Sequence, residues 1–157
     1  MASSRPRVYV DADIFASVLK AEPTSNICMD VLAAAERKDI QLIASRLLPV
    51  EIAAYKGGAP GLDAANDLIA QFLDSVEAEW VELDLLIQRE AARLSWAHQL
   101  RASDAIHFAT ALRRNANHFM ALDQAYPHGQ VIGGMLVGPP RIVWDPILFD
   151  GGDGTGH

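Results

Sequence analysis

The chain has 157 residues, half of them hydrophobic, and a formal net charge of −7. This length supports one hydrophobic core, and the negative charge argues against nucleic-acid binding through a broad basic surface, because such binding depends on neutralisation of phosphates by Lys and Arg. No apolar run reaches the roughly 20 residues of a membrane span, and the single cysteine, Cys28, excludes an internal disulfide. We therefore expect a one-domain cytoplasmic protein without membrane contact.

The two ends of the chain differ in composition from the part between them. Residues 1–6 lack the apolar core of a signal peptide and predict a short flexible arm. The Gly-rich residues 149–157 have no apolar side chains to bury and predict a disordered tail. Residues 7–148 then form the single domain, and the turn cluster at 56–61 lies inside it, because too few residues flank that cluster for two cores.

Apolar periodicity predicts strands that alternate with helices along the chain. Residues 7–10 form a run of β-branched and aromatic residues, which suits a strand covered on both faces. Further strands are predicted over residues 40–44, 80–83 and 118–122, with a possible fifth at an edge over 141–144. Helices are predicted over residues 14–19, 24–38, 62–76, 85–97 and 104–115, and after Ser45, with Ser45, Asp84 and Ser103 as caps.

This alternation predicts the fold class. Strands that alternate with helices form a parallel sheet with right-handed crossovers. We therefore expect a three-layer α/β fold, in which a central, mainly parallel sheet of four to five strands is flanked by helices.

Four acidic residues recur at equivalent places in this pattern. Asp11 and Asp123 each follow a predicted strand, Asp104 opens a helix, and Glu51 lies early in another. In a parallel sheet the carboxyl ends of the strands and the N-termini of the following helices lie at the same end of the molecule, where ligands bind. We therefore expect all four side chains to converge in one crevice.

Converging carboxylates predict a metal site. At a separation of about 5 Å and an effective dielectric of 20, each pair repels by roughly 3 kcal/mol. The sequence offers too few Lys and Arg beside these acids to offset the repulsion, and an all-oxygen site suits Mg²⁺ or Mn²⁺ better than Zn²⁺. Such a site favours in-line displacement at phosphorus, so the predicted reaction is phosphodiester hydrolysis.

Four segments in this order resemble the PIN-domain proteins of the VapC-like ribonuclease toxin type. The match extends over about residues 7–145, nearly all of the predicted domain. The segments are residues 8–13, 45–51, 100–107 and 121–126.

The resemblance implies an endoribonuclease toxin whose Mg²⁺ or Mn²⁺ ligands are Asp11, Glu51, Asp104 and Asp123. It also implies an RNA substrate, a cognate antitoxin that inserts a basic or apolar segment at the acidic cleft, and a homodimer. Asp13 stands where the family usually has a small polar residue, and it would either bind the metal through water or add negative charge that raises the metal requirement.

Two further positions depart from the family pattern. Ala121 replaces a frequent Thr, and Tyr126 replaces a frequent Phe. The loss of the Thr hydroxyl removes a hydrogen bond that would support a metal ligand.

Structural roles compete with the catalytic ones. Asp11 and Asp104 could serve only as a cap and as a partner of the helix dipole, and Cys28 suits a core position. His107 could act as a general base or pack inside the protein. Five basic residues could line an RNA path or form solvated helix faces: Arg46, Lys56, Arg101, Arg113 and Arg114.

Two other functions remain open from the sequence. Haloacid dehalogenase-like phosphatases also begin with a strand that ends in Asp-x-Asp, with Asp11 as the nucleophile and Asp13 as the general acid, but they need a downstream lysine, and no lysine follows Lys56. A catalytically silent PIN-like module that recruits a partner is the second alternative.

Overall fold

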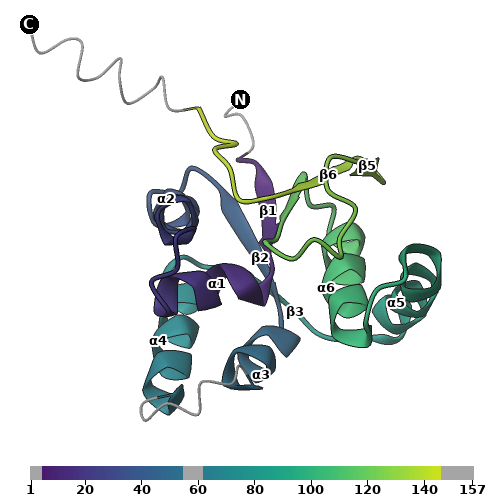
Figure 1. Ribbon diagram of the computed structural model, residues 1–157, viewed down its shortest axis with the longest axis horizontal. Helices are drawn as coiled ribbons and strands as arrows, with labels where there is room; N and C mark the ends of the chain where they lie inside the picture. Colours follow the sequence, from purple (N-terminus) through teal and green to yellow (C-terminus); the bar gives the residue numbers. More distant parts are fainter. Residues whose placement is uncertain (1–4, 55–61, 146–157) are drawn as a thin grey trace, which may run out of the picture.

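A six-stranded sheet forms the centre of the protein (Figure 1). The structure, a computed structural model, describes residues 5–54 and 62–145, with the backbone alone for 62–66. In spatial order the strands run β3-β2-β1-β4-β6-β5, and only the edge strand β5 is antiparallel to its neighbour. The strands are β1 (Arg7–Val10), β2 (Gln41–Ser45), β3 (Glu79–Val81), β4 (His118–Met120), β5 (Val131–Ile132) and β6 (Met135–Gly138).

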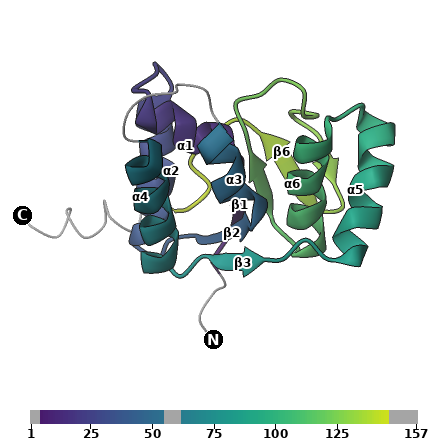
Figure 2. The same ribbon diagram turned by 90° about the horizontal axis from the view of Figure 1, so that it is seen from below.

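Helices cover both faces of this sheet, four on one face and two on the other (Figure 2). The helices are α1 (Ala12–Leu19), α2 (Ser25–Glu36), α3 (Leu47–Ala54), α4 (Leu62–Ser75), α5 (Leu85–His98) and α6 (Ala102–Arg113). Helices α1 to α4 pack over one face, and α5 and α6 over the other. The predicted three-layer α/β fold with a mainly parallel sheet is confirmed.

Strand β1 is buried on both faces, which explains its uninterrupted apolar sequence. Val8 and Val10 point into the core beneath α1 to α4, where Cys28 also lies, and Tyr9 points into the core beneath α5 and α6. Successive side chains of a strand alternate between faces, so one short strand contributes to both cores.

Strand β1 is also the point at which the strand order reverses. The chain moves from β1 to β2 and β3 on one side, and later returns to pair β4 on the other side of β1. Ligands of open α/β sheets bind outside the carboxyl ends of the strands at such a switch point. The crevice beyond β1 and β4 is therefore the expected site, and Asp11 follows β1 directly.

The sheet edge differs from the sequence prediction. Residues 141–144 do not form a strand; instead β6 and β5 extend the sheet beyond β4. Two glycines with positive φ, Gly133 and Gly134, make the two-residue turn between these strands, and a Gly-Gly pair between apolar residues is a hairpin signal. The Arg141 side chain donates hydrogen bonds to the backbone carbonyls of Pro139 and Leu136. These bonds hold the segment in place, although it pairs with no strand.

The capping predictions had mixed outcomes. Asp84 caps α5 by accepting a hydrogen bond from the backbone N–H of Ile87 at 2.9 Å. Ser45 accepts from the N–H of Leu47 at the start of α3. The prediction for Ser103 was wrong, because α6 begins at Ala102 and Ser103 lies in its first turn, where its side chain interacts with Glu51.

Three segments named in the sequence analysis lie outside the part of the chain that the structure describes. They are residues 1–4 of the predicted arm, the turn cluster at 56–61 with Lys56, and the predicted tail at 149–157. Within the described ranges, the Pro6 carbonyl accepts a hydrogen bond from the N–H of Gln41 in β2. None of the described helices has the length and apolar character needed to cross a membrane.

Replacing the cap of α5 should destabilise the fold without affecting the crevice. We expect Asp84→Ala to lower the free energy of unfolding by about 1 kcal/mol, because the N–H of Ile87 loses its acceptor. Asp84→Asn retains an acceptor oxygen and should remain close to the wild type. Urea denaturation of the three proteins measures the difference, and equal losses in both variants would indicate that the charge matters and the cap does not.

Candidate active site

The predicted acidic residues meet at the carboxyl ends of β1 and β4. Asp11 follows β1, Asp13 lies in α1, Glu51 in α3 and Asp104 in the first turn of α6, while Asp123 lies in the loop after β4. Each is joined to another of them through an intervening side chain or a backbone N–H. The structure thus brings together residues that are far apart in the sequence.

Asp11 is more than a helix cap. It occupies the N-cap position of α1, but its carboxylate makes no capping hydrogen bond. The residue is only 5% exposed, and its backbone N–H donates to the Met120 carbonyl at 3.0 Å, which ties the end of β1 to β4. Its Oδ1 lies 3.3 Å from the Tyr126 hydroxyl and 3.8 Å from Nε2 of His107. The carboxylate therefore faces the crevice.

Glu51 reaches the same place from α3 and is held there by His107. Nε2 of His107 hydrogen-bonds Oε1 of Glu51, and Nδ1 of the same ring hydrogen-bonds the Tyr9 hydroxyl. Burial, followed by the charge of Asp11, raises the pKa of Tyr9, so the phenol is protonated and donates to Nδ1. Nε2 then carries the ring proton and donates to Glu51. His107 is fully buried, which fits a supporting role and not that of an exposed general base.

Asp104 and Asp123 are joined by an arginine at the start of α6. Nε of Arg101 lies 3.3 Å from Oδ2 of Asp104, and its Nη2 lies 3.4 Å from Oδ2 of Asp123. Asp104 is only 4% exposed, whereas the Arg101 side chain is 77% exposed. The guanidinium group of Arg101 is thus exposed to solvent while it contacts both carboxylates.

The other basic residues that were candidates for an RNA path lie elsewhere. Arg113 and Arg114 are at the C-terminal end of α6, away from Asp104, and Arg114 pairs with Glu79 at the start of β3. Arg46 pairs with Glu82 and stacks on Trp80. Of these residues within the described ranges, Arg101 alone contacts the acidic cluster.

Asp13 is partly satisfied by the backbone of the loop that carries Asp123. Its Oδ2 accepts hydrogen bonds from the N–H groups of Leu122 and Asp123, at 3.1 and 2.9 Å. Its Oδ1 is buried and has no hydrogen-bond partner within the described part of the chain. A buried carboxylate oxygen without a partner is costly, so Asp13 has a free ligand position.

The electrostatics of the cluster show an excess of negative charge. Burial, followed by the like charges of Asp13, Glu51 and Asp104, raises the pKa of Asp11 well above its usual value. Burial would also raise the pKa of Glu51, but the hydrogen bond from His107, with help from Ser103 and Arg101, lowers it instead. Glu51 thus has a partner in His107, and Asp104 and Asp123 have one in Arg101, whereas Asp11 has little compensation.

These residues fit a hard divalent cation. Ligand atoms of Asp11, Glu51 and His107 lie within 4.8 Å of one another. Because Nε2 of His107 carries the proton donated to Glu51, the available donors are carboxylate oxygens, including the unpartnered Oδ1 of Asp13. An all-oxygen donor set suits Mg²⁺ or Mn²⁺.

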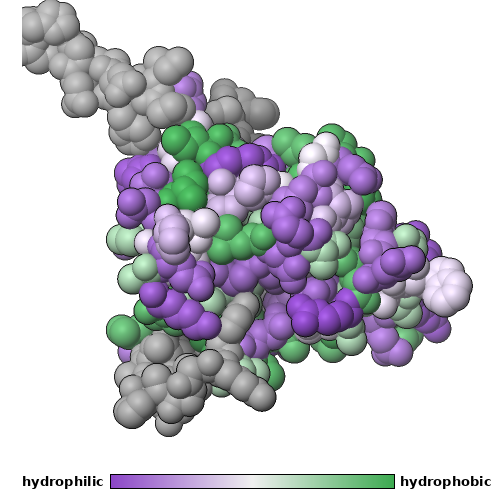
Figure 3. Space-filling view, viewed as in Figure 1, coloured by the Kyte–Doolittle hydropathy of each residue, from purple (hydrophilic) through white to green (hydrophobic). Residues whose placement is uncertain are grey.

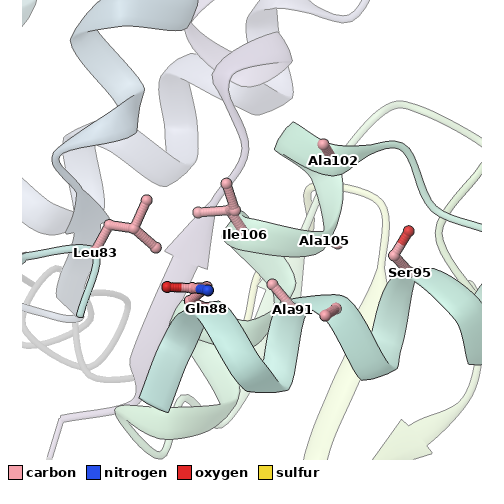
Figure 4. Close-up of a pocket in the computed structure, with 8 residues that line it drawn as sticks. Leu83, Gln88, Ala91, Ser95, Ala102, Ala105 and Ile106 are labelled. Carbon is pink, nitrogen blue, oxygen red and sulfur yellow. The ribbon is translucent and has the colours of Figure 1, made fainter. Parts of the chain in front are cut away.

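Two cavities of about 250 Å³ each lie near this end of the protein, with different chemistry. One is lined by Glu51, Ala54, Arg101 and Ser103 and opens over the acidic cluster. The other lies between α5 and α6 beside Leu83, and its walls are mostly alanines and Ile106 (Figure 4). The second contains no carboxylate, so the first is the candidate active site.

The face of the molecule shown in Figure 3 is not uniformly apolar. On the coloured part of the face in Figure 3, hydrophobic side chains occur as separate patches among hydrophilic ones. Single exposed apolar residues such as Val50 and Trp96 are ordinary on a folded protein.

Three residues at this site were not predicted as supports of the carboxylates, although Arg101 was considered for an RNA path and His107 as a general base. Arg101 is the N-cap residue of α6, three positions before Asp104, and His107 lies three positions after Asp104, so each can neighbour Asp104. This spacing could have identified them. Tyr126 was noted only as a departure from a family pattern, and nothing in its neighbouring sequence indicates its contacts with two distant carboxylates.

Comparison with known proteins identifies relatives of the chain. The family model of the PIN domain matches residues 8–129. Ribonuclease VapC45 of Mycobacterium tuberculosis (strain CDC 1551 / Oshkosh) and ribonuclease VapC49 of M. tuberculosis (strain ATCC 25618 / H37Rv) are each 30% identical to it over 116 residues, which cover 68% of this chain and 76% of each relative.

A solved structure has a similar fold. The crystal structure of VapBC2 from Rickettsia felis bound to a DNA fragment from their promoter includes a chain that aligns with a TM-score of 0.63 and 12% identity. The alignment covers 88% of the present chain and 99% of that chain. At this identity the likeness concerns the fold alone.

Removing the charge of Asp11 should stabilise the metal-free protein. Because the folded-state pKa of Asp11 is raised, the folded state bears the full repulsion above that pKa and is relieved of it as the pH falls through it. We expect Asp11→Asn to raise the free energy of unfolding at pH 8 by about 1 kcal/mol or more, and less at pH 5. Urea denaturation with a chelator measures both values.

The matched control for this experiment is Asp30→Asn, which removes an exposed charge from α2. Its stability should follow that of the wild type at both pH values. A destabilised Asp11→Asn protein at pH 8 would contradict the proposed repulsion.

Proposed function

The chain belongs to the PIN domain family, and from this premise we propose that it is a divalent-metal-dependent endoribonuclease that hydrolyses RNA phosphodiester bonds as the toxin of a toxin–antitoxin pair. The observation that carries the proposal is the convergence of five acidic side chains from four separate segments in one crevice. Carboxylates gathered in this way are costly without a cation. The names of the two mycobacterial relatives support RNA as the substrate.

In this proposal Asp11, Glu51, Asp104 and Asp123 hold Mg²⁺ or Mn²⁺. Asp13 either binds the cation through water or adds to the charge that the cation must neutralise. When bound, the cation supplies an activated water and neutralises the negative charge that develops on the phosphate.

The chain itself contributes positioning and charge. His107 and Tyr9 hold Glu51 at the cavity, which reduces its conformational freedom before substrate arrives. Arg101 lies at the mouth of the cavity and presents a guanidinium group that can bind a phosphate oxygen. Because the protein is acidic overall, the cation and this arginine supply the positive charge that draws RNA to the site.

A catalytically silent PIN-like module is the second candidate. Ala121 is fully buried at the end of β4 and has no side-chain group that can bond the acidic cluster. RNA cleavage in the presence of Mn²⁺ by the wild type, and its loss in a variant that lacks one ligand, would exclude a silent module. Membership of the PIN family also favours a nuclease over a phosphatase with an Asp11 nucleophile.

Replacement of Asp104 should remove both metal binding and activity. We expect Asp104→Asn to weaken Mn²⁺ binding and to lower the rate of RNA cleavage by at least about 100-fold, since a metal ligand loses its charge. Calorimetric titration with Mn²⁺ measures the first effect, and cleavage of a labelled RNA measures the second. Asp67→Asn, which changes an exposed acid of α4, is the control and should match the wild type. Undiminished RNA cleavage by the wild type in the presence of a chelator would contradict the proposal.

We further infer a cognate antitoxin, a homodimer and a cytoplasmic location. The structurally similar Rickettsia felis chain comes from the crystal structure of VapBC2 bound to a promoter DNA fragment. The acidic cleft of the present chain suits a basic inserted segment.

When the chain is expressed together with its neighbouring genes, a small protein should copurify with it. Removal of that protein should release RNA cleavage, and size-exclusion chromatography should show a dimer. A monomer that is fully active in the presence of all products of the neighbouring genes would count against this inference.

A further inference from the structure

The hydroxyl of Tyr126 lies between two of the proposed metal ligands. It is 3.3 Å from Oδ1 of Asp11 and 3.2 Å from Oδ1 of Asp104. Asp11 follows the central strand, Asp104 lies on α6, and Tyr126 belongs to the loop after β4. One oxygen atom thus connects three elements that the sequence separates.

The ring of Tyr126 has little freedom to move. It packs against Phe119 at a centroid distance of 4.7 Å and against Phe108 at 6.0 Å. The residue is only 2% exposed. Side chains in such close-packed surroundings keep one rotamer, so the hydroxyl stays at a defined point between the two carboxylates.

The single proton of the Tyr126 hydroxyl cannot serve both carboxylates at once. A phenol has one proton to donate, whereas Asp11 and Asp104, in the ionised form that would bind a cation, offer only acceptors. The hydroxyl can therefore satisfy one carboxylate oxygen at a time, while its lone pairs face the other. The hydroxyl thus fixes the two groups relative to one another without neutralising them, and a cation shared by both carboxylates would provide the missing charge.

We propose that Tyr126 is a positioning residue for the divalent cation: its hydroxyl sets the spacing and orientation at which Asp11 and Asp104 share the metal. This inference rests on the metal site of the proposed function and adds a residue to it. Tyr126 is buried beneath the carboxylates and touches no substrate, so it acts through them. Outer partners of this kind are typically worth 10- to 100-fold in metal affinity or activity.

A purely structural role for Tyr126 makes a different prediction. If the ring only fills the core between Phe108 and Phe119, phenylalanine would serve equally well. Tyr126→Phe retains the ring and removes only the hydroxyl, which separates the two roles.

The test compares Tyr126→Phe with the wild type and with Thr110→Val. Thr110 is a buried residue of the same helix as Asp104, and its hydroxyl donates to the Ile106 carbonyl at 2.7 Å. Thr110→Val therefore removes a buried hydroxyl of α6 that hydrogen-bonds the helix backbone and not a carboxylate. Circular dichroism and thermal unfolding report the folded state of each protein.

We expect Tyr126→Phe to bind Mn²⁺ about 10-fold more weakly in calorimetric titration, and Thr110→Val to bind it within about twofold of the wild type. RNA cleavage by Tyr126→Phe should fall at limiting Mn²⁺ and recover towards the wild-type rate at saturating Mn²⁺. Equal Mn²⁺ affinity in Tyr126→Phe and the wild type would overturn the positioning role alone. No Mn²⁺ binding by the wild type would instead overturn the proposed function.

A measurement on the wild type covers the case in which Tyr126→Phe does not fold. A hydroxyl proton held between buried carboxylates exchanges slowly and gives its own proton NMR signal. Because both partners of the hydroxyl bind the cation in this proposal, saturating Mg²⁺ should shift that signal. A signal that stays unchanged while Mg²⁺ binding is visible elsewhere at the site would overturn the inference.

Discussion

The structure depends on one constraint: several carboxylates are held together at the end of a fully buried strand. Strand β1 supplies side chains to both cores, so its position is fixed by packing on two faces, and Asp11 is carried with it to the switch point of the sheet. Burial, followed by repulsion from Asp13, Glu51 and Asp104, raises the pKa of Asp11. The favourable free energy of core packing partly offsets the unfavourable free energy of holding these carboxylates together.

Neutral groups limit this cost without removing it. The N–H groups of Leu122 and Asp123 bind Asp13, and the Tyr126 hydroxyl lies between Asp11 and Asp104. His107 binds Glu51 and is itself bound by Tyr9. These contacts orient the carboxylates and leave their charge largely uncompensated, which is the condition under which a divalent cation binds strongly. The same contacts hold the carboxylates in a defined arrangement.

The acidic character of the protein is compatible with the proposed RNA substrate if the proposed cation is bound. Proteins that hold nucleic acid through surface charge need many Lys and Arg residues, and this chain has few near the crevice. A cation in the crevice reverses the local sign of the field, and Arg101 at the mouth of the cavity adds to it. Attraction is then confined to the place where cleavage would occur.

The sequence by itself determined the layers of the fold and the acids at its switch point. Local patterns can be recognised in the sequence alone. They include the alternation of strands and helices, the apolar run before Asp11 and the order of the four acids. The hairpin of β5 and β6 was not predicted, although the Gly133-Gly134 pair is a signal for it. Only the tertiary structure decided that Tyr126, His107 and Arg101 join the acids, because those contacts depend on packing between segments distant in the chain. The hydrogen bonds of Tyr126 illustrate this, since no neighbour of that residue in sequence contributes to them.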